Sequence, residues 1–337
     1  MERTSRIEPV AGPSLWSAEE LAARGDWIIR VDAAALDDIA AALDGVKRRR
    51  IALADISAED FPLPSMAAQL SAIKALLSDG PGVALIRGLP VDQYDQSDLG
   101  LMLWGIGAHI GTGVVQSYRG DLIGEVMDMT HTGDARRAYR SPRPLDLHTD
   151  SADIAALLCL RRAKSGGMSL ITSSYAVHDA MLAERPDLMP YLYRGYHYQR
   201  SEADSSGESP TTPHRIPVFA ESGGRLACFF NANSIERAIE AGNVEVEPAA
   251  VEAFELFDAT AGRDDLLFRQ MLEPGDLQFL NNRIVMHGRT AFEDFDELPR
   301  KRLLLRVWLK MPDWPEPPGE MMLHRNRRVV KAEGASA

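Results

Sequence analysis

Two histidines and one carboxylate in this chain have the residue types of an iron ligand set. His148 and Asp150 are separated by a single residue, and His287 lies far downstream. Two histidines and one carboxylate on one face of the metal form the facial triad of non-haem Fe(II) sites, which leaves coordination positions open for a co-substrate and oxygen. The three residues therefore suggest an oxygenase that uses O2.

The spacing of His148 and Asp150 fits a β-strand. Residues i and i+2 of a strand point to the same face, so both side chains can reach one metal if PLDLHTD is extended. Pro142 and Pro144 disfavour a helix here. The pair alone is weak, because a chain with 8 histidines and 49 acidic residues contains about one His-x-Asp/Glu pair by chance. A metal site therefore needs support from other segments.

The segment around His287 gives that support. A turn signal at 274–276 is followed by an apolar strand and then by a second strand that ends at His287. The alternating strand KRLLLRVWLK comes next and places Arg302 and Arg306 on one face. Buried guanidiniums are costly unless they meet anions, so these arginines indicate either a bound carboxylate or acidic residues of the protein.

The elements that must position these residues are predicted to be helices in the N-terminal part of the chain and mainly strands after it. A capping box opens a short helix at Ser17. Apolar spacing and composition predict longer helices at 33–44, 65–78, 95–109, 175–184 and 248–262. From about residue 113, short apolar segments between polar turns predict strands. This order is typical of a mainly β protein, a sandwich or jelly roll with helical cladding.

We expect three regions along the chain. An N-terminal arm with helices covers 1–78, the core covers 79–315, and a C-terminal tail covers 316–337. The polar, serine-rich segment near 199–214 is either a disordered surface loop or a lid over the active site.

Composition limits the partners and the location. The net charge of −12 disfavours nucleic acid. The N-terminus has no apolar core of a secretory signal, and no run approaches the length of a membrane span. Cys159 and Cys228 lie in apolar stretches, which predicts two small core residues and suits the cytoplasm. Whether the chain forms a homo-oligomer stays an open question.

Several segments in order resemble one family. They are LDLHTDSADIAALLCL, AKSGGMSLITSS, GDLQFLNNRIVMHGRTAFED and RKRLLLRVWL, preceded by GPGVALIRGLP at 80–90. Together they resemble the TauD/TfdA family of Fe(II)/2-oxoglutarate-dependent oxygenases, with its clavaminate synthase-like relatives. The resemblance implies a double-stranded β-helix, or jelly roll, that holds the metal at its mouth.

The resemblance also implies roles for single residues. The iron ligands would be His148, Asp150 and His287. Arg302 matches the arginine that holds the distal carboxylate of 2-oxoglutarate. Ser169 matches a position where relatives often place threonine for the same carboxylate, and Thr172 is a nearby rival.

The substrate side is less defined. Arg306 matches an arginine that contacts substrate or co-substrate in relatives, and Gln116 is expected to line the pocket. The resemblance implies oxidation, by default hydroxylation, of a small molecule that is anionic or amino-acid-like. Related halogenases have a small residue in place of the metal carboxylate, so Asp150 disfavours halogenation.

Three other functions stay open at this point. A cupin-type metalloenzyme without 2-oxoglutarate shares the jelly roll but leaves Arg302 and Ser169 unexplained. A non-catalytic binding protein could retain the fold. A zinc hydrolase could use the same triad but needs a general base near an activated water, and no further motif marks one.

Overall fold

Two antiparallel β-sheets form the centre of the molecule. The computed structural model describes residues 7–117, 120–132, 138–200, 209–242, 244–321 and 323. The larger sheet has the strand order β1-β2-β12-β6-β15-β3, with β4 also paired to β15. Its strands are β1 (Ile28–Arg30), β2 (Val83–Arg87), β3 (Thr112–Val114), β4 (Gly124–Val126), β6 (Ile154–Arg161), β12 (Leu277–Asn281) and β15 (Leu303–Lys310). All its pairs are antiparallel except β1 with β2.

The smaller sheet has the order β11-β8-β13-β5. Its strands are β5 (Leu145–His148), β8 (Ser169–Ser173), β11 (Phe268–Gln270) and β13 (Val285–Arg289). Inward side chains of both sheets, such as Ile171 and Leu304, belong to one buried apolar cluster. Neighbouring strands come from distant parts of the sequence, as in a jelly roll. The predicted fold class is confirmed.

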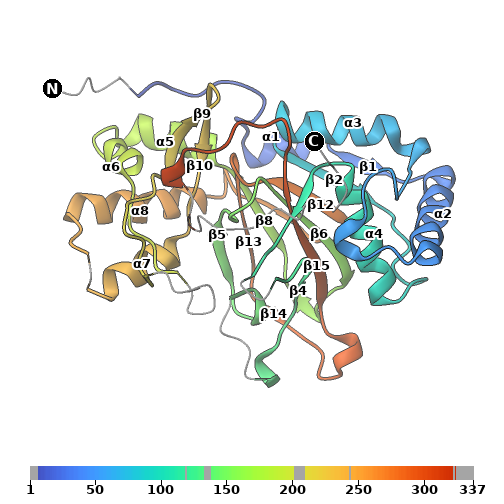
Figure 1. Ribbon diagram of the computed structural model, residues 1–337. Coiled ribbons are helices and arrows are strands. Elements are labelled where there is room, and N and C mark those ends of the chain that lie inside the picture. The colour runs from blue at the N-terminus through green and yellow to red at the C-terminus, as the bar shows by residue number, and fades with distance from the viewer. Residues whose placement is uncertain are drawn as a thin grey trace.

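Helices cover the two sheets from opposite sides (Figure 1). On one side lie α2 (Ala33–Arg49), α3 (Ala67–Ser78) and α4 (Gln96–Ala108), and on the other α5 (Ser174–Glu184), α6 (Met189–Arg194), α7 (Ala232–Glu240) and α8 (Pro248–Ala261). Leu303 and Leu305 of β15 pack into the first helical cluster, whereas Met286 of β13 packs into the second. Each sheet therefore buries one face against helices and the other against its partner sheet.

Local signals explain where several helices begin. Ser17 and Glu20 form the predicted capping box of α1 (Ala18–Ala23). The carboxylates of Asp32 and Asp95 accept hydrogen bonds from backbone N–H groups in the first turns of α2 and α4. Arg50, the only described non-glycine residue with a positive φ, follows α2 in the left-handed region.

Several elements differ from the sequence expectation. The helices α6 and α7 were not expected, because α6 has only 6 residues and α7 directly follows the apolar run LACFFN. Asn231 is the signal that marks α7, since its side chain accepts a hydrogen bond from the backbone of Ser234. The first of the strands expected from about residue 113 is short, since β3 ends at Val114.

Two short antiparallel strand pairs complete the strands. They are β7 (Ser165–Gly166) with β14 (Phe292–Glu293), and β9 (Phe219–Ser222) with β10 (Arg225–Cys228). Both cysteines are free and buried, as predicted. None of the described helices is long and apolar enough to cross a membrane.

The regional boundaries at 78 and 315 stay a prediction. The strand β1 from the N-terminal region joins the larger sheet, and Met321 packs into the second helical cluster. Within the polar segment, residues 201–208 lie outside the described chain, and its two ends meet at a bridge between Gln199 and Thr211.

Candidate metal centre

Two adjacent strands bring the histidines together. His148 ends β5, and His287 is its direct partner on β13, so both rings lie on the same face of the smaller sheet. Asp150 lies two residues beyond the end of β5, although we expected the whole segment to be one strand. Its position is set by a hydrogen bond from its backbone N–H to the Asn282 side chain, 3.1 Å. The end of β5 and the middle of β13 therefore position the triad.

The three side chains converge on a common point. The Nε2 atom of His148 lies 3.7 Å from Asp150 Oδ1, and the Nε2 atom of His287 lies 3.6 Å from Asp150 Oδ2. One ligand atom from each residue falls within 4.8 Å of the others. Atoms that each lie about 2.1 Å from one metal are separated by about 3–4 Å, so the arrangement fits a single ion. Two nitrogens and one carboxylate leave further positions free, as an iron oxygenase needs.

Hydrogen bonding fixes the tautomer of His148. Its Nδ1–H donates to the backbone carbonyl of Asp146, 2.8 Å, which leaves the lone pair of Nε2 directed at the metal position. Within the described chain, Nδ1 of His287 has no hydrogen-bond partner. The His287 ring is instead held by burial and by the His148 ring, whose centroid lies 4.4 Å away.

The charges at the triad suit metal binding. Burial by itself would raise the pKa of Asp150, but Arg306 and the two histidines hold that pKa well below its usual range. Burial, together with repulsion from His148, lowers the pKa of His287 to about 3. At neutral pH the carboxylate is therefore ionised and His287 is neutral, which are the protonation states that ligate metals.

Arg306 lies directly behind the metal carboxylate. Its Nη1 donates to both oxygens of Asp150 at 3.4 Å, and its Nε donates to the Gln116 side chain at 2.9 Å. Trp308 donates from its indole N–H to Asp150 Oδ2, 2.8 Å. The structure thus brings Arg306 and Gln116 together beside the triad, while Trp308 was not singled out from the sequence.

Arg302 and Ser169 face the space between the sheets, whereas Thr172 does not. Arg302 is 6% exposed and its Nη1 has no hydrogen-bond partner in the described chain. Ser169 shares its side of β8 with Ile171, the direct partner of His287. Thr172 points to the opposite face, where its hydroxyl donates to the carbonyl of Leu266 at 3.2 Å. Of the two hydroxyl candidates, the structure brings only Ser169 to the inner side.

Sequence reasoning missed two buried polar residues near Arg302. Arg289 lies two residues after His287 on the same side of β13 and is 3% exposed. Gln278 of β12 is fully buried and accepts a hydrogen bond from the Ser169 hydroxyl, 3.1 Å. The alternation that selected Arg302 and Arg306 also selects Arg289, because residues i and i+2 of a strand share a face.

A small cavity opens onto the metal carboxylate. It measures about 140 Å³ and is bordered by Asp150, Asn282 and Phe229 as well as by Met321 and Leu323 near the C-terminus. A cavity of this size accommodates a small organic group.

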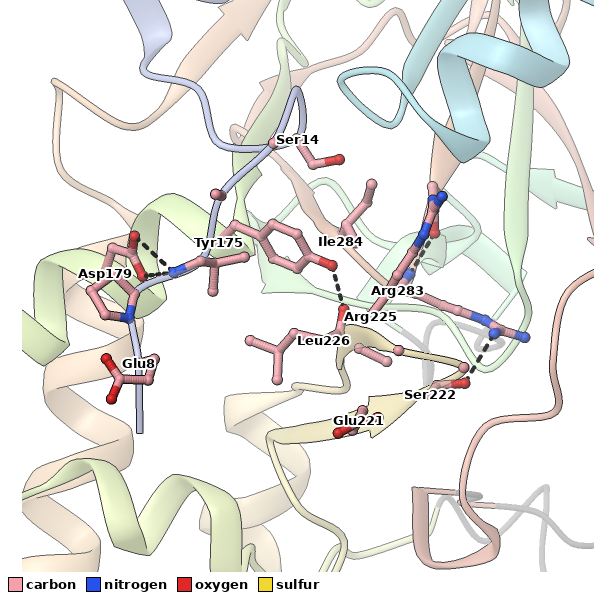
Figure 2. Close-up of a pocket in the computed structure, with 18 of the residues that line it drawn as sticks. Glu8, Ser14, Tyr175, Asp179, Glu221, Ser222, Arg225, Leu226, Arg283 and Ile284 are labelled. Atoms are coloured by element: carbon pink, nitrogen blue, oxygen red, sulfur yellow. Dashed lines mark hydrogen bonds between the residues drawn. The ribbon is translucent and has the colours of Figure 1, made fainter. Parts of the chain in front are cut away.

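A larger cleft of about 2030 Å³ lies elsewhere, between the N-terminal segment 7–14, α5 and the β9–β10 hairpin (Figure 2). Tyr175 donates to the Leu226 carbonyl there, 2.6 Å, and the Val10 N–H donates to Asp179, 2.9 Å. None of the triad residues lines this cleft, so its size does not make it the reaction site.

Asp258 of α8 allows a test of how burial and neighbouring charges change a pKa in this protein. Burial, together with the charges of Asp146 and Glu236, raises its pKa from 3.8 to about 6. The folded state therefore binds the proton more tightly than the unfolded state, and ionisation above pH 6 costs stability. We expect Asp258→Asn to raise the free energy of unfolding at pH 8 by about 1–2 kcal/mol, allowing for the partial exposure of this side chain.

The extra stability of the Asp258→Asn protein should shrink as the pH falls through 6. It should vanish below about pH 4, where the wild-type carboxyl is protonated in both the folded and the unfolded state. Urea unfolding at pH 8 and pH 4 measures the difference. Equal stability of the two proteins at pH 8 would contradict the assignment.

Comparison with known proteins agrees with this site. Residues 47–308 match the family described as "Taurine catabolism dioxygenase TauD, TfdA family". FR-33289 synthase of Streptomyces rubellomurinus is 27% identical over 327 residues, which cover 94% of this chain and 95% of that protein. A taurine hydroxylase-like protein of Stachybotrys chartarum is 26% identical over 324 residues, which cover 90% of this chain and 81% of that protein.

Solved structures share the fold. An asparagine oxygenase in complex with Fe(II), 3-hydroxyasparagine and succinate has a TM-score of 0.68 at 17% identity, covering 84% of this chain and 93% of that one. The non-haem iron oxygenase OrfP in complex with Fe and α-ketoglutaric acid has a TM-score of 0.62 at 15% identity, covering 84% and 94%. The family predicted from the ordered segments is confirmed. Because the family match spans most of the sequence, this chain belongs to the TauD/TfdA dioxygenase family.

Proposed function

We propose that this Fe(II)- and 2-oxoglutarate-dependent dioxygenase hydroxylates an aliphatic C–H bond of a small anionic molecule, with iron held by His148, Asp150 and His287. The observation that carries the proposal is the convergence of these three side chains within 4.8 Å beside a small cavity. The overall reaction converts substrate, 2-oxoglutarate and O2 to hydroxylated substrate, succinate and CO2. Location in the cytoplasm, oligomeric state and the lack of nucleic-acid partners stay predictions.

The chain's residues bind and orient the reactants. Bound iron supplies the activation of O2 that is coupled to decarboxylation of 2-oxoglutarate. His148 and His287 present neutral nitrogens on one face, and Asp150 adds a negative charge that Trp308 orients through its indole N–H. The apolar side chains between the sheets, among them Ile171, keep water away from the reacting groups.

Arg302 is the residue that we assign to the distal carboxylate of 2-oxoglutarate. The guanidinium is buried, and burial lowers its pKa to about 10, so it remains a cation at neutral pH. Phe292 lies against it, with the Cζ atom 5.3 Å from the ring centroid. A buried cation with an unused N–H favours a carboxylate strongly.

Arg306 supports an anionic substrate. It lies beside Asp150 and is 6% exposed, and its Nη2 takes part in none of the hydrogen bonds to Asp150 or Gln116. One relative is called uridine-5'-phosphate dioxygenase, and the asparagine oxygenase structure holds a hydroxylated amino acid. We therefore assign to this arginine a carboxylate or phosphate of the substrate.

A succinate-release screen tests the proposal. The purified protein, with Fe(II), ascorbate and 2-oxoglutarate, is incubated with amino acids, other small carboxylates, phosphate esters and sulfonates. We expect at least one anionic compound to stimulate succinate formation and to gain one oxygen atom by mass spectrometry. Stimulation only by neutral or cationic compounds would contradict the anionic substrate, and turnover independent of 2-oxoglutarate would contradict the reaction.

The role of Arg306 gives a further prediction. We expect Arg306→Gln to raise KM for the anionic substrate by about 10- to 100-fold, because a charge-assisted hydrogen bond is lost. The dissociation constant of 2-oxoglutarate should change far less. Trp308→Phe is the comparison variant, because it removes a hydrogen bond to Asp150 but keeps the cation. If both variants shift KM equally, Arg306 acts only through Asp150.

A further inference from the structure

Three buried polar side chains and the half-buried Ser169 lie close together near the ends of strands from both sheets. Arg289 is the last residue of β13, and its direct partner is Ser169, the first residue of β8. The Ser169 hydroxyl donates to Gln278 near the start of β12, and Arg302 immediately precedes β15. The position that a Cβ on Gly167 would occupy is 3.1 Å from Arg302 Nε, so this glycine makes room for the guanidinium. The cluster is therefore confined on several sides.

Several of the donors in this cluster are unused. Within the described chain, Arg289 Nε and Nη1, Arg302 Nη1 and Gln278 Nε2 are all buried without a hydrogen-bond partner. The three residues are 3%, 6% and 0% exposed. The nearest acidic contact of Arg302, from Asp294, involves its backbone N–H rather than its guanidinium. Buried donors without acceptors are rare in folded proteins and call for a ligand.

The two guanidiniums also repel each other. Both lie against Phe292, with Cζ atoms 4.6 and 5.3 Å from the ring centroid. Arginine side chains are cations at neutral pH. Two buried like charges with free N–H groups are a site for an anion.

We propose that Arg289 and Arg302 together hold the distal carboxylate of 2-oxoglutarate, with the Gln278 amide as an uncharged third donor. This inference rests on the proposed function. Arg289 lies two residues from His287, about 7 Å along the strand. The carbon chain of 2-oxoglutarate, with four C–C bonds, extends about 5 Å. A co-substrate bound to the metal at one end therefore reaches this cluster with its other end.

A purely structural role for Arg289 makes a different prediction. Its Nη2 donates to the carbonyls of Ser141 at 2.8 Å and Arg143 at 2.6 Å, in the segment that leads to β5 and His148. If that were its whole role, a substitution would disturb the metal end of the site. The affinity for every 2-oxo acid would then fall by the same factor, whether or not the acid has a distal carboxylate.

The test compares two 2-oxo acids of equal length. Binding of 2-oxoglutarate and of 2-oxovalerate, which lacks the distal carboxylate, is measured by calorimetry on the Mn(II)-loaded protein without O2. We expect Arg289→Met to weaken 2-oxoglutarate binding by about 10- to 100-fold and to leave 2-oxovalerate binding within about twofold. Gln278→Leu should weaken 2-oxoglutarate less, because its donor is uncharged.

Arg300→Met is the matched control, since that arginine lies in the same segment as Arg302 but is exposed and contacts Phe295. An Arg289→Met protein that binds 2-oxoglutarate like the wild type, or that loses both acids equally, overturns the inference. A wild-type protein that does not distinguish the two acids overturns the proposed co-substrate site itself. The two failures are therefore separable.

Discussion

Replacing His287 by alanine is expected to lower turnover by about a thousandfold or more, because the metal loses one of three protein ligands. His287 is the strand partner of His148, and its Nε2 lies 3.6 Å from Asp150. The primary measurement is succinate formation at saturating Fe(II), combined with Mn(II) affinity by calorimetry. Succinate formation and Mn(II) affinity should both fall, because activity requires the bound metal.

Two comparisons make this result interpretable. His197→Ala removes a half-buried histidine whose Nδ1 donates to the Thr212 carbonyl, away from the triad, and should retain turnover. Circular dichroism of His287→Ala should show native secondary structure, because its neighbours on β13 remain buried. A folded His287→Ala protein with wild-type activity would refute the metal assignment.

Replacing Arg302 by methionine should have two opposite effects. The affinity for 2-oxoglutarate should fall by about 100- to 1000-fold, because truncating one partner of a buried charge pair costs about 2–5 kcal/mol. The protein without co-substrate should become more stable, because a buried guanidinium with an unused N–H is replaced by an apolar chain of similar length. Few substitutions lower affinity and raise stability at once.

Calorimetry with 2-oxoglutarate and thermal unfolding of the unliganded protein measure the two effects. Arg300→Met should change neither, since its guanidinium is exposed. If Arg302→Met lowers the melting temperature and leaves 2-oxoglutarate affinity intact, Arg302 is a structural cation whose partner lies within the protein.

Local sequence rules predicted the parts of the site that depend on strand alternation. Arg302 and Arg306 were selected because side chains alternate along KRLLLRVWLK, and His287 was selected because it ends a predicted strand. The structure buries all three. The same rules misplaced the strand around Asp150, which is held beyond β5 by Asn282, 132 residues further along the chain. That contact joins residues far apart in the sequence, so no local pattern contains it.

The sequence alone did not predict which strands pair or in what register. Ser169 was the matched hydroxyl donor and Thr172 a nearby rival, and the register of β8 against β13 separates them. The hydrogen bond between Ser169 and Gln278 depends on how two sheets pack face to face, which is set by the whole core. The short helices α6 and α7 were missed because their stability comes from tertiary packing rather than from length.

The contact between Arg306 and Asp150 should couple the binding of a metal ion to the binding of an anion. In the protein without metal, the guanidinium attracts the carboxylate that iron needs. A bound ion of charge +2 neutralises that carboxylate, so the positive charge of Arg306 attracts another anion more strongly. The metal and the anionic substrate that we propose should therefore reinforce each other, and by reciprocity each increases the affinity for the other by the same factor.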